Sequence, residues 1–186
     1  MTILKRKVIL YHKSNESDNL IAFLSLSESI TFEKKKDHFF EITTDLFEDE
    51  FDLSNLRGMA LQEIYQDFTA FICPNSGVFD MKLTYEVLPL VSFGVYTPES
   101  LIKAICFLNQ GEYITRLKSF YNNHFGHETI DSILGFIKND MNATKASKEL
   151  YMHRNTMNYR LDHFVEKSEV NVRHFTGAFA FYLLFS

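Results

Sequence analysis

A cluster of hydrogen-bonding side chains lies near the C-terminal end of the sequence. It consists of His153, Arg154, Asn155, Thr156 and Asn158. Arg and Asn are the side chains that pair with base edges in the major groove of DNA, and they do so from the first turns of a short helix. We therefore predict that residues 151–162 form the turn and second helix of a helix-turn-helix.

The predicted helix from Arg154 to Val165 has two faces at helical spacing. The apolar face, expected to pack on the domain, carries Met157, Leu161 and Phe164. The opposite face, expected to be open, carries Asn155, Tyr159 and Asp162. His153 occupies the capping position, and Met152 is expected to fill the core between the two helices.

Residues 142–150 are predicted to form the first helix of the motif. Ala146 and Ser147 are small where two helices must approach closely, and Leu150 is expected to point inward. Either Asn142 or Thr144 can cap this helix, and free backbone N–H groups at its start favour a nearby phosphate.

Two motifs give this region a family resemblance. His153-Arg-Asn-Thr-Met-Asn-Tyr-Arg-Leu161 resembles the H-R-N-T-(apolar)-x-Y-R-L signature of PucR-type transcriptional regulators, and Asn142-x-Thr-Lys-Ala-Ser147 resembles the opening of Fis-type helix-turn-helices. The resemblance covers about residues 127–186. It implies that base edges are approached by Arg154, Asn155 and Asn158. It also implies that phosphates are held by Thr144, Lys145, Thr156, Tyr159 and Arg160, with His153 beside them in the DNA-binding set.

The sequence departs from that family in the turn after the second helix. Glu169 stands where members usually have Gly, and Asn171 stands where Asp is common, so this turn is expected to differ. Considered without the resemblance, Arg160 could instead pair with Glu149 or Glu166. Tyr159 could equally be half-buried packing.

Composition predicts a folded, cytoplasmic protein. The 186 residues are 46% hydrophobic and include 19 Phe, which is enough for a well-formed core. No apolar run approaches the length of a membrane helix, and the first residues lack the order of a signal peptide. We therefore expect no membrane association. Cys73 and Cys106 stand outside any C-x-x-C pair, so both are expected to be reduced thiols.

Charge is distributed unevenly along the chain. The net charge of −5 arises in residues 1–126, with 12 Lys/Arg and 17 Asp/Glu, whereas residues 127–186 hold 7 of each. A neutral region can bind DNA if its basic groups share one face, but the affinity of a monomer should be modest. The expected form is therefore a homodimer whose two half-site contacts combine.

The N-terminal region is predicted to be an α+β domain with a small mixed or antiparallel sheet. Expected strands are residues 8–11, 20–26, 30–32, 39–43, 69–73 and 91–96; expected helices are 52–68, capped by Ser54, and 80–88. From Thr97-Pro98 onward the pattern is helical, at 98–108, 112–123, 129–138 and 175–185. The predicted domains are 1–110, a helical linker at 111–126, and an all-α helix-turn-helix domain at 127–186.

Other chemistry is not supported by the sequence. PucR-type regulators often carry a degenerate GGDEF-like domain, which residues 38–75 fit in order, but Phe47-Glu-Asp-Glu-Phe51 lacks the paired glycines and is better read as an acidic loop. His124 and His127 have no further ligands at metal spacing, and Glu48–Asp52 lacks the pattern of a calcium loop. We predict no catalytic residues, no metal and no cofactor, and hence no enzyme.

The expected function is sequence-specific binding of double-stranded DNA by a transcription regulator. The alternative is a protein–protein adaptor whose helix-turn-helix no longer reads DNA. The apolar helix at 175–185 is either core packing or a dimer contact. A small-molecule effector at the N-terminal domain stays open, as do the operator and the regulatory sense.

Overall fold

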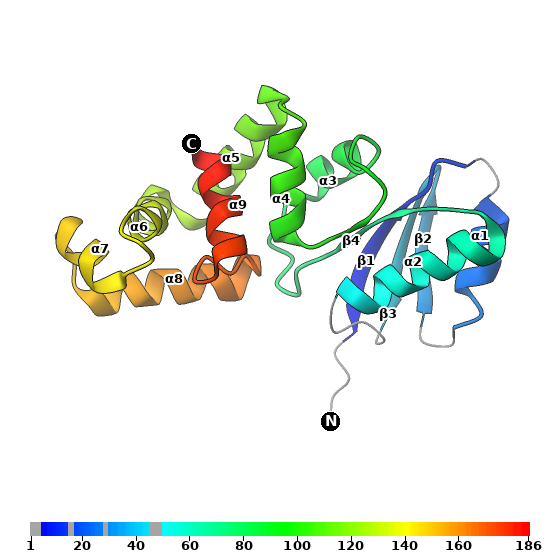
Figure 1. Ribbon diagram of the computed structural model, residues 1–186, viewed down its shortest axis with the longest axis horizontal. Helices are drawn as coiled ribbons and strands as arrows, with labels where there is room; N and C mark the ends of the chain where they lie inside the picture. The colour runs from blue at the N-terminus through cyan, green and yellow to red at the C-terminus, as the bar shows by residue number, and fades with distance from the viewer. Residues whose placement is uncertain (1–4, 15–16, 28–29, 45–49) are drawn as a thin grey trace. The chain divides into compact units, whose positions relative to one another are not determined.

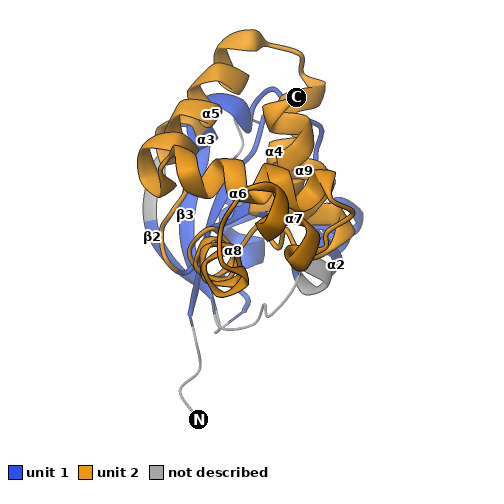
Figure 2. Ribbon diagram, turned by 90° about the vertical axis from the view of Figure 1, so that its left-hand side faces the viewer, with its two compact units in different colours: residues 1–75, 84–97 blue, residues 76–83, 98–186 orange. Residues whose placement is uncertain are grey.

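The computed structural model describes residues 5–14, 17–27, 30–44 and 50–186. Contacts divide the chain into two compact units, residues 1–75 with 84–97 and residues 76–83 with 98–186 (Figure 2). The first unit contains a β-sheet with helices and the second is helical (Figure 1). The predicted order of an α+β region followed by an all-α region is confirmed. The longer segment of the second unit begins at residue 98, ahead of the predicted linker at 111–126, and residues 127–186 as a separate domain stay a prediction.

The sheet of the first unit has five strands in the order β2-β3-β1-β4-β5. Its strands are β1 (Arg6–Tyr11), β2 (Ile30–Lys36), β3 (Phe39–Thr44), β4 (Thr69–Ile72) and β5 (Val95–Tyr96). β1 is antiparallel to both β3 and β4, β2 forms a hairpin with β3, and β5 is parallel to β4. The sheet is therefore mixed, which is one of the two arrangements that the sequence predicted.

Alternating side chains place one face of this sheet against two helices. In β3 the buried residues are Phe40, Ile42 and Thr44, and every second residue between them is only partly buried. α1 (Ser17–Leu24) and α2 (Glu50–Ile64) contribute Leu20, Leu24, Leu53 and Ala60 to the same core as the strands. This core holds the unit together.

Two sequence predictions fail in this unit. Residues 20–26, predicted as a strand, lie largely in helix α1, because a short apolar run does not distinguish a buried strand from a buried helix face. Ser54, predicted to cap the following helix, lies inside α2, which begins at Glu50. The acidic segment 47–51 lies partly outside the described residues, so its interpretation as an acidic loop stays a prediction, as does the GGDEF-like order of residues 38–75.

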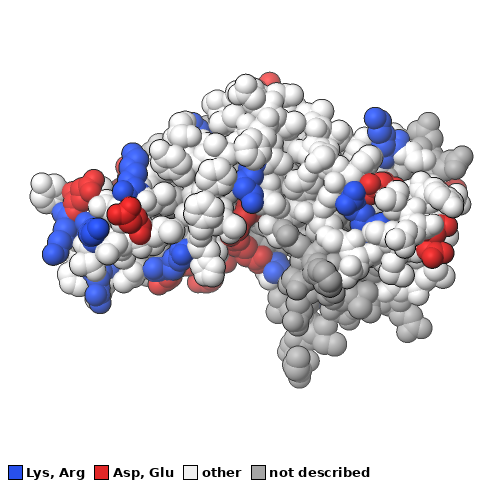
Figure 3. Space-filling view, viewed as in Figure 1, with Lys and Arg blue, Asp and Glu red and all other residues white. Residues whose placement is uncertain are grey.

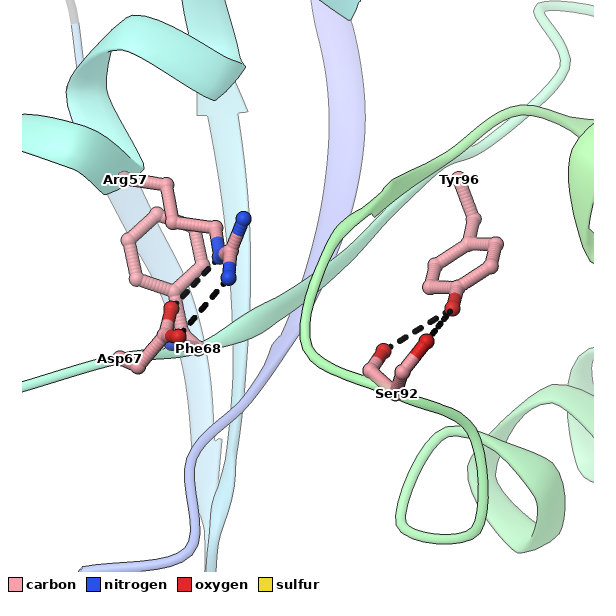
Figure 4. Close-up of polar contacts among 5 residues, drawn as sticks. All are labelled: Arg57, Asp67, Phe68, Ser92 and Tyr96. Carbon is pink, nitrogen blue, oxygen red and sulfur yellow. Dashed lines mark hydrogen bonds and ion pairs between the residues drawn. The ribbon is translucent and has the colours of Figure 1, made fainter.

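Polar contacts fix the chain on either side of β4 and β5 (Figure 4). Arg57 of α2 makes two hydrogen bonds, of 2.5 and 2.8 Å, to the carboxylate of Asp67, which also accepts the backbone N–H of Phe68 at 2.8 Å. The hydroxyl of Tyr96 donates to the backbone oxygen of Ser92 at 2.9 Å. These bonds tie the middle of α2 to the segment just before β4 and close the turn before β5.

The remaining helices are α3 (Met81–Val87), α4 (Pro98–Phe107), α5 (Gly111–Phe125), α6 (His127–Lys138), α7 (Ala143–Glu149), α8 (Arg154–Ser168) and α9 (Phe175–Phe185). Each matches a predicted helix with small shifts at its ends. None of the helices in the described ranges is both long and apolar enough to cross a membrane.

An aromatic core joins α5, α8 and α9. The ring of Tyr121 lies 5.8 Å from that of Phe164 and 6.0 Å from that of Phe181, and all three residues are fully buried. Phe164 and Phe181 are themselves 5.0 Å apart. Large rings from three helices in mutual contact supply much of the apolar burial of this unit.

Candidate nucleic-acid interface

Helix α7 begins with a complete side-chain cap. The Oδ1 atom of Asn142 accepts the backbone N–H groups of Thr144 and Lys145, both at 3.0 Å. Asn142 is therefore the capping residue of the two that the sequence offered. The expectation of free N–H groups fails at these two residues, because Asn142 already occupies them. A phosphate near α7 would meet the exposed side chains of Thr144 and Lys145.

A tight turn connects α7 to α8. Tyr151 has a φ of 51° in the left-handed region and a side chain that is 98% exposed. The backbone N–H of Met152 returns to Ser147 at 2.9 Å. His153 then caps α8, because its Nδ1 atom accepts the N–H of Asn155 at 3.2 Å. Two short helices joined by so few residues are held in one relative orientation.

The inner face of α8 is as predicted. Met157, Leu161 and Phe164 are fully buried. Leu150 at the end of α7 packs so closely on Gly135 of α6 that a Cβ at Gly135 would lie 2.6 Å from its Cδ1 atom. The three buried side chains fix the inner face of α8, and Leu150 fixes the end of α7 on α6.

The outer face of α8 is open at its start. Arg154, Asn155 and Thr156 are exposed, and no contact within the described part of the chain holds the Arg154 guanidinium. Tyr159 is 69% exposed and its ring stacks on His163 with centroids 6.0 Å apart. The half-buried packing considered for Tyr159 is therefore not observed.

Arg160 is bound within the protein. Its Nη1 atom donates to the backbone oxygen of Glu128 at 3.1 Å and to the hydroxyl of Ser132 at 3.0 Å, and its Nη2 atom pairs with the Glu128 carboxylate. Its side chain is only 22% exposed. The partners considered from the sequence, Glu149 and Glu166, are not the ones observed. In this arrangement Arg160 ties α8 to the start of α6.

Arg173, which sequence reasoning missed, contacts two residues of α8. Its Nε atom donates to Asp162 at 2.9 Å, and its Nη2 atom donates to Asn158 at 3.2 Å. The two partners are four residues apart and so lie on one face of the helix. The four-residue spacing of Asn158 and Asp162 was visible in the sequence. Arg173, however, lies in the turn before α9, where no local sequence pattern indicates that it contacts α8.

The turn after α8 keeps a left-handed cap. Glu169 has a φ of 55°, and its N–H returns to Val165. This conformation favours glycine, which explains why members of the resembled family usually have Gly here. The turn therefore differs from the family pattern in its residue type, Glu in place of Gly, and not in its backbone conformation, which is still left-handed.

Charges of both signs mix over the helical unit (Figure 3). Lys145 lies 3.7 Å from Asp140 with both side chains largely exposed, so this pair is weak. A hydrogen bond from Lys167 lowers the pKa of the exposed Glu166 carboxyl. No group of three or more His, Cys, Asp or Glu residues with metal-binding geometry occurs in the described ranges. The exposed guanidinium of Arg154 at the start of α8 is thus available to attract a phosphate or a base.

The helical region is similar to a known family of domains. Residues 129–186 match the family model of the PucR C-terminal helix-turn-helix domain. The uncharacterized protein YxkF of Bacillus subtilis (strain 168) is 39% identical over 49 residues, which are 26% of this chain and 16% of that protein. A regulator of polyketide synthase expression from Bifidobacterium adolescentis has a solved structure that aligns over 97% of this chain and 78% of its own, with a TM-score of 0.45 and 13% identity. Residues 129–186 are thus similar to the PucR-type helix-turn-helix domain.

Proposed function

We propose that this protein is a sequence-specific DNA-binding transcription regulator that acts as a homodimer in the cytoplasm. The observation that carries the proposal is the exposed start of α8, where no contact within the described residues engages the side chain of Arg154 or Asn155, on a helix whose inner face is buried. Such a helix end can enter the major groove, with Arg suited to guanine and Asn to adenine.

The proposed interface contains the residues that the family resemblance implies. Base edges are approached by Arg154, Asn155 and Asn158. Phosphates are held by Thr144, Lys145, His153, Thr156 and Tyr159. Arg160 contributes indirectly, because its donors are occupied by Glu128 and Ser132.

Alanine substitution of Arg154 or Asn155 tests the proposal. Both side chains are exposed, so each variant should keep the melting temperature of the wild type while losing specific binding in a gel-shift assay with a selected DNA site. Lys82→Ala removes an exposed cation of α3 and serves as the matched control, expected to bind normally. Unchanged affinity in both α8 variants would refute the assignment.

A groove beside α9 supports the dimer. It has a volume of about 620 Å³ and is lined in part by Met141, Phe175, Phe179 and Tyr182. Phe175 is 72% exposed and stacks on Phe179 at 5.9 Å. Lys138 and Asp140 at the same groove carry opposite charges, which a two-fold axis could bring together across two copies. Exposed apolar surface of this kind usually marks a partner.

Sedimentation of the full chain tests the dimer separately from DNA binding. Phe175→Glu should shift the protein to monomer, because a charge placed in an apolar interface loses its water. Phe107→Glu changes an equally exposed phenylalanine, on α4, and should leave the assembly unchanged. A wild-type monomer at all concentrations, or a dimer that survives Phe175→Glu, would rule out this interface.

The adaptor alternative is favoured by one observation, the mixed charge of the helical unit (Figure 3). The salt dependence of retention on DNA distinguishes the two functions. A DNA binder is retained on DNA at low salt and released steeply as salt rises, whereas an adaptor is not retained at either. The regulatory role of residues 1–110 and any small-molecule effector there remain predictions.

A further inference from the structure

Arg173 contacts two residues of α8 and one residue of α6. Its guanidinium lies 2.7 Å from Asp162 through Nη2 and 3.2 Å from Asn158 through the same nitrogen. It also lies 5.9 Å from the ring centroid of Phe136, on α6. Only 34% of its side chain is exposed. A guanidinium with this many partners has little freedom to leave them.

These contacts fix the orientation of the Asn158 side chain. A guanidinium has hydrogen-bond donors and no acceptor, so the group of Asn158 that faces Arg173 must be the carbonyl oxygen. The –NH₂ group of the same carboxamide then points away from Arg173. An unrestrained asparagine can present its oxygen and its nitrogen side by side, which is the arrangement that pairs with adenine.

We infer that Arg173 is a positioning residue that sets base preference by turning Asn158 into a hydrogen-bond donor. This inference rests on the proposed DNA-binding function. With its oxygen turned toward Arg173, Asn158 presents the hydrogens of its –NH₂ group to the groove and selects an edge made of acceptors. Guanine presents two acceptors there, N7 and O6, whereas adenine presents one acceptor and one donor. The base facing Asn158 should therefore be guanine in preference to adenine.

Arg173 has a second effect on the same surface. Asp162 is 66% exposed and lies one turn beyond Asn158, where its negative charge would repel phosphates. The Arg173 guanidinium offsets that charge. Loss of Arg173 should therefore weaken binding to all sequences to some extent, and the diagnostic result is the change of base preference at one position.

Selection of bound fragments from random DNA, with the full chain, tests the inference. Arg173→Met keeps most of the side-chain volume and removes the donors. It should lower the guanine-over-adenine preference at one position of each half-site by about fivefold to tenfold, the range of one lost hydrogen bond. Asn158→Ala should abolish the preference at the same position. The double variant should match Asn158→Ala alone.

Asn158→Asp gives a test that leaves Arg173 in place. Aspartate has nearly the same shape, keeps an oxygen for Arg173 and lacks the –NH₂ group. Its remaining oxygen accepts hydrogen bonds, so preference at that position should move from guanine to cytosine, whose N4 is a donor. This variant keeps the ion-pairing network and should fold even if Arg173→Met does not.

The outcomes separate this inference from the proposed function. If the wild type selects a sequence but Arg173→Met binds all sequences more weakly without a local change of preference, the inference is overturned and the function stands. The inference is also overturned if Arg173→Met changes the base preference at a position that Asn158→Ala does not affect. If the wild type selects no sequence and shows no retention on DNA, the proposed function fails first.

Discussion

The guanidinium of Arg160 donates a hydrogen bond of 3.0 Å to the hydroxyl of Ser132, one helix before the helix-turn-helix. Ser132 is fully buried and itself donates to the Glu128 backbone oxygen at 2.6 Å. The arginine of the Y-R-L motif thus connects α8 to the first turn of α6. Its structural role can be measured separately from any contact with DNA.

Arg160→Met should lower the free energy of unfolding by about 1–2 kcal/mol, because bonds to a partly buried guanidinium are lost. Glu128→Gln should cost much less, at most about 0.5 kcal/mol, since the Glu128 side chain is 83% exposed and its ion pair is screened by water. Urea denaturation measures both. Equal losses in the two variants would show that the ion pair, and not the bonds to Ser132 and the backbone, fixes the helix.

Glu169→Gly should stabilise the protein by about 1 kcal/mol. The residue has a φ of 55°, a conformation that costs an L-residue with a Cβ about 1–2 kcal/mol and glycine very little. Glu169→Ala removes the same carboxylate but keeps the Cβ, so it should lack this gain. A gain from alanine as large as that from glycine would attribute the effect to the carboxylate.

Gly177→Ala should destabilise the helical unit by about 1–3 kcal/mol, the usual cost of overpacking. An added Cβ would lie 2.3 Å from the backbone oxygen of Asn171, and backbone cannot move aside as a flexible side chain can. Gly58→Ala is the control, because nothing lies within 4 Å of its added Cβ in helix α2. That change should stabilise by about 0.5–1 kcal/mol. Thermal melts of both variants distinguish close packing from a general effect of alanine.

Tyr121→Phe should leave stability unchanged or raise it by up to about 1 kcal/mol. The Tyr121 hydroxyl is buried without a hydrogen-bond partner in the described structure, and burial raises its pKa well above the usual range. Removing a buried polar group that has no partner should carry no penalty. Tyr85→Phe provides the contrast, because that hydroxyl donates to Glu41 at 2.5 Å and its loss should cost about 1 kcal/mol. Equal losses in calorimetry would mean that Tyr121 has a partner after all.

Cys73 should react slowly with thiol reagents and should make the fold sensitive to alkali. Burial raises the pKa of its thiol from 9.0 to about 12. Between about pH 9 and pH 12 the unfolded chain therefore loses a proton that the folded protein keeps, so the contribution of Cys73 is complete below pH 9 and is lost as pH rises through this window. Denaturation midpoints should fall less steeply with pH in Cys73→Ala. Parallel pH profiles would contradict the shift. Cys106, with a pKa raised by burial to about 11, should react first.

Local signals in the sequence were sufficient for the helical region. The cap at His153 and the buried Met157 depend on residues within one or two turns, so spacing alone predicts them, and it narrows the cap of α7 to Asn142 or Thr144. The α+β class of the N-terminal region was also predicted from local signals. Burial alternates from one residue to the next along strands such as β3.

Long-range partners could not be predicted in this way. Leu20 and Leu24 of α1 share the core with Leu53 and Ala60 of α2, and a short apolar run in the sequence does not encode such a long-range contact. Arg160 and Glu128 are 32 residues apart, and Arg173 and Asn158 are 15 apart. The sequence contains many acidic and amide side chains that could pair with Arg160 or Arg173. The partners that they have are determined by how α6 and the turn before α9 pack on α8.

The cap of α8 also determines where the proton of a neutral His153 lies. Because Nδ1 accepts the Asn155 N–H, it carries no hydrogen, and the neutral imidazole must be the Nε2–H tautomer. The exposed ring therefore presents a donor on its other nitrogen, beside the start of the recognition helix. A phosphate oxygen is an acceptor. The tautomer that closes the helix end is thus also the one that suits a nucleic-acid backbone.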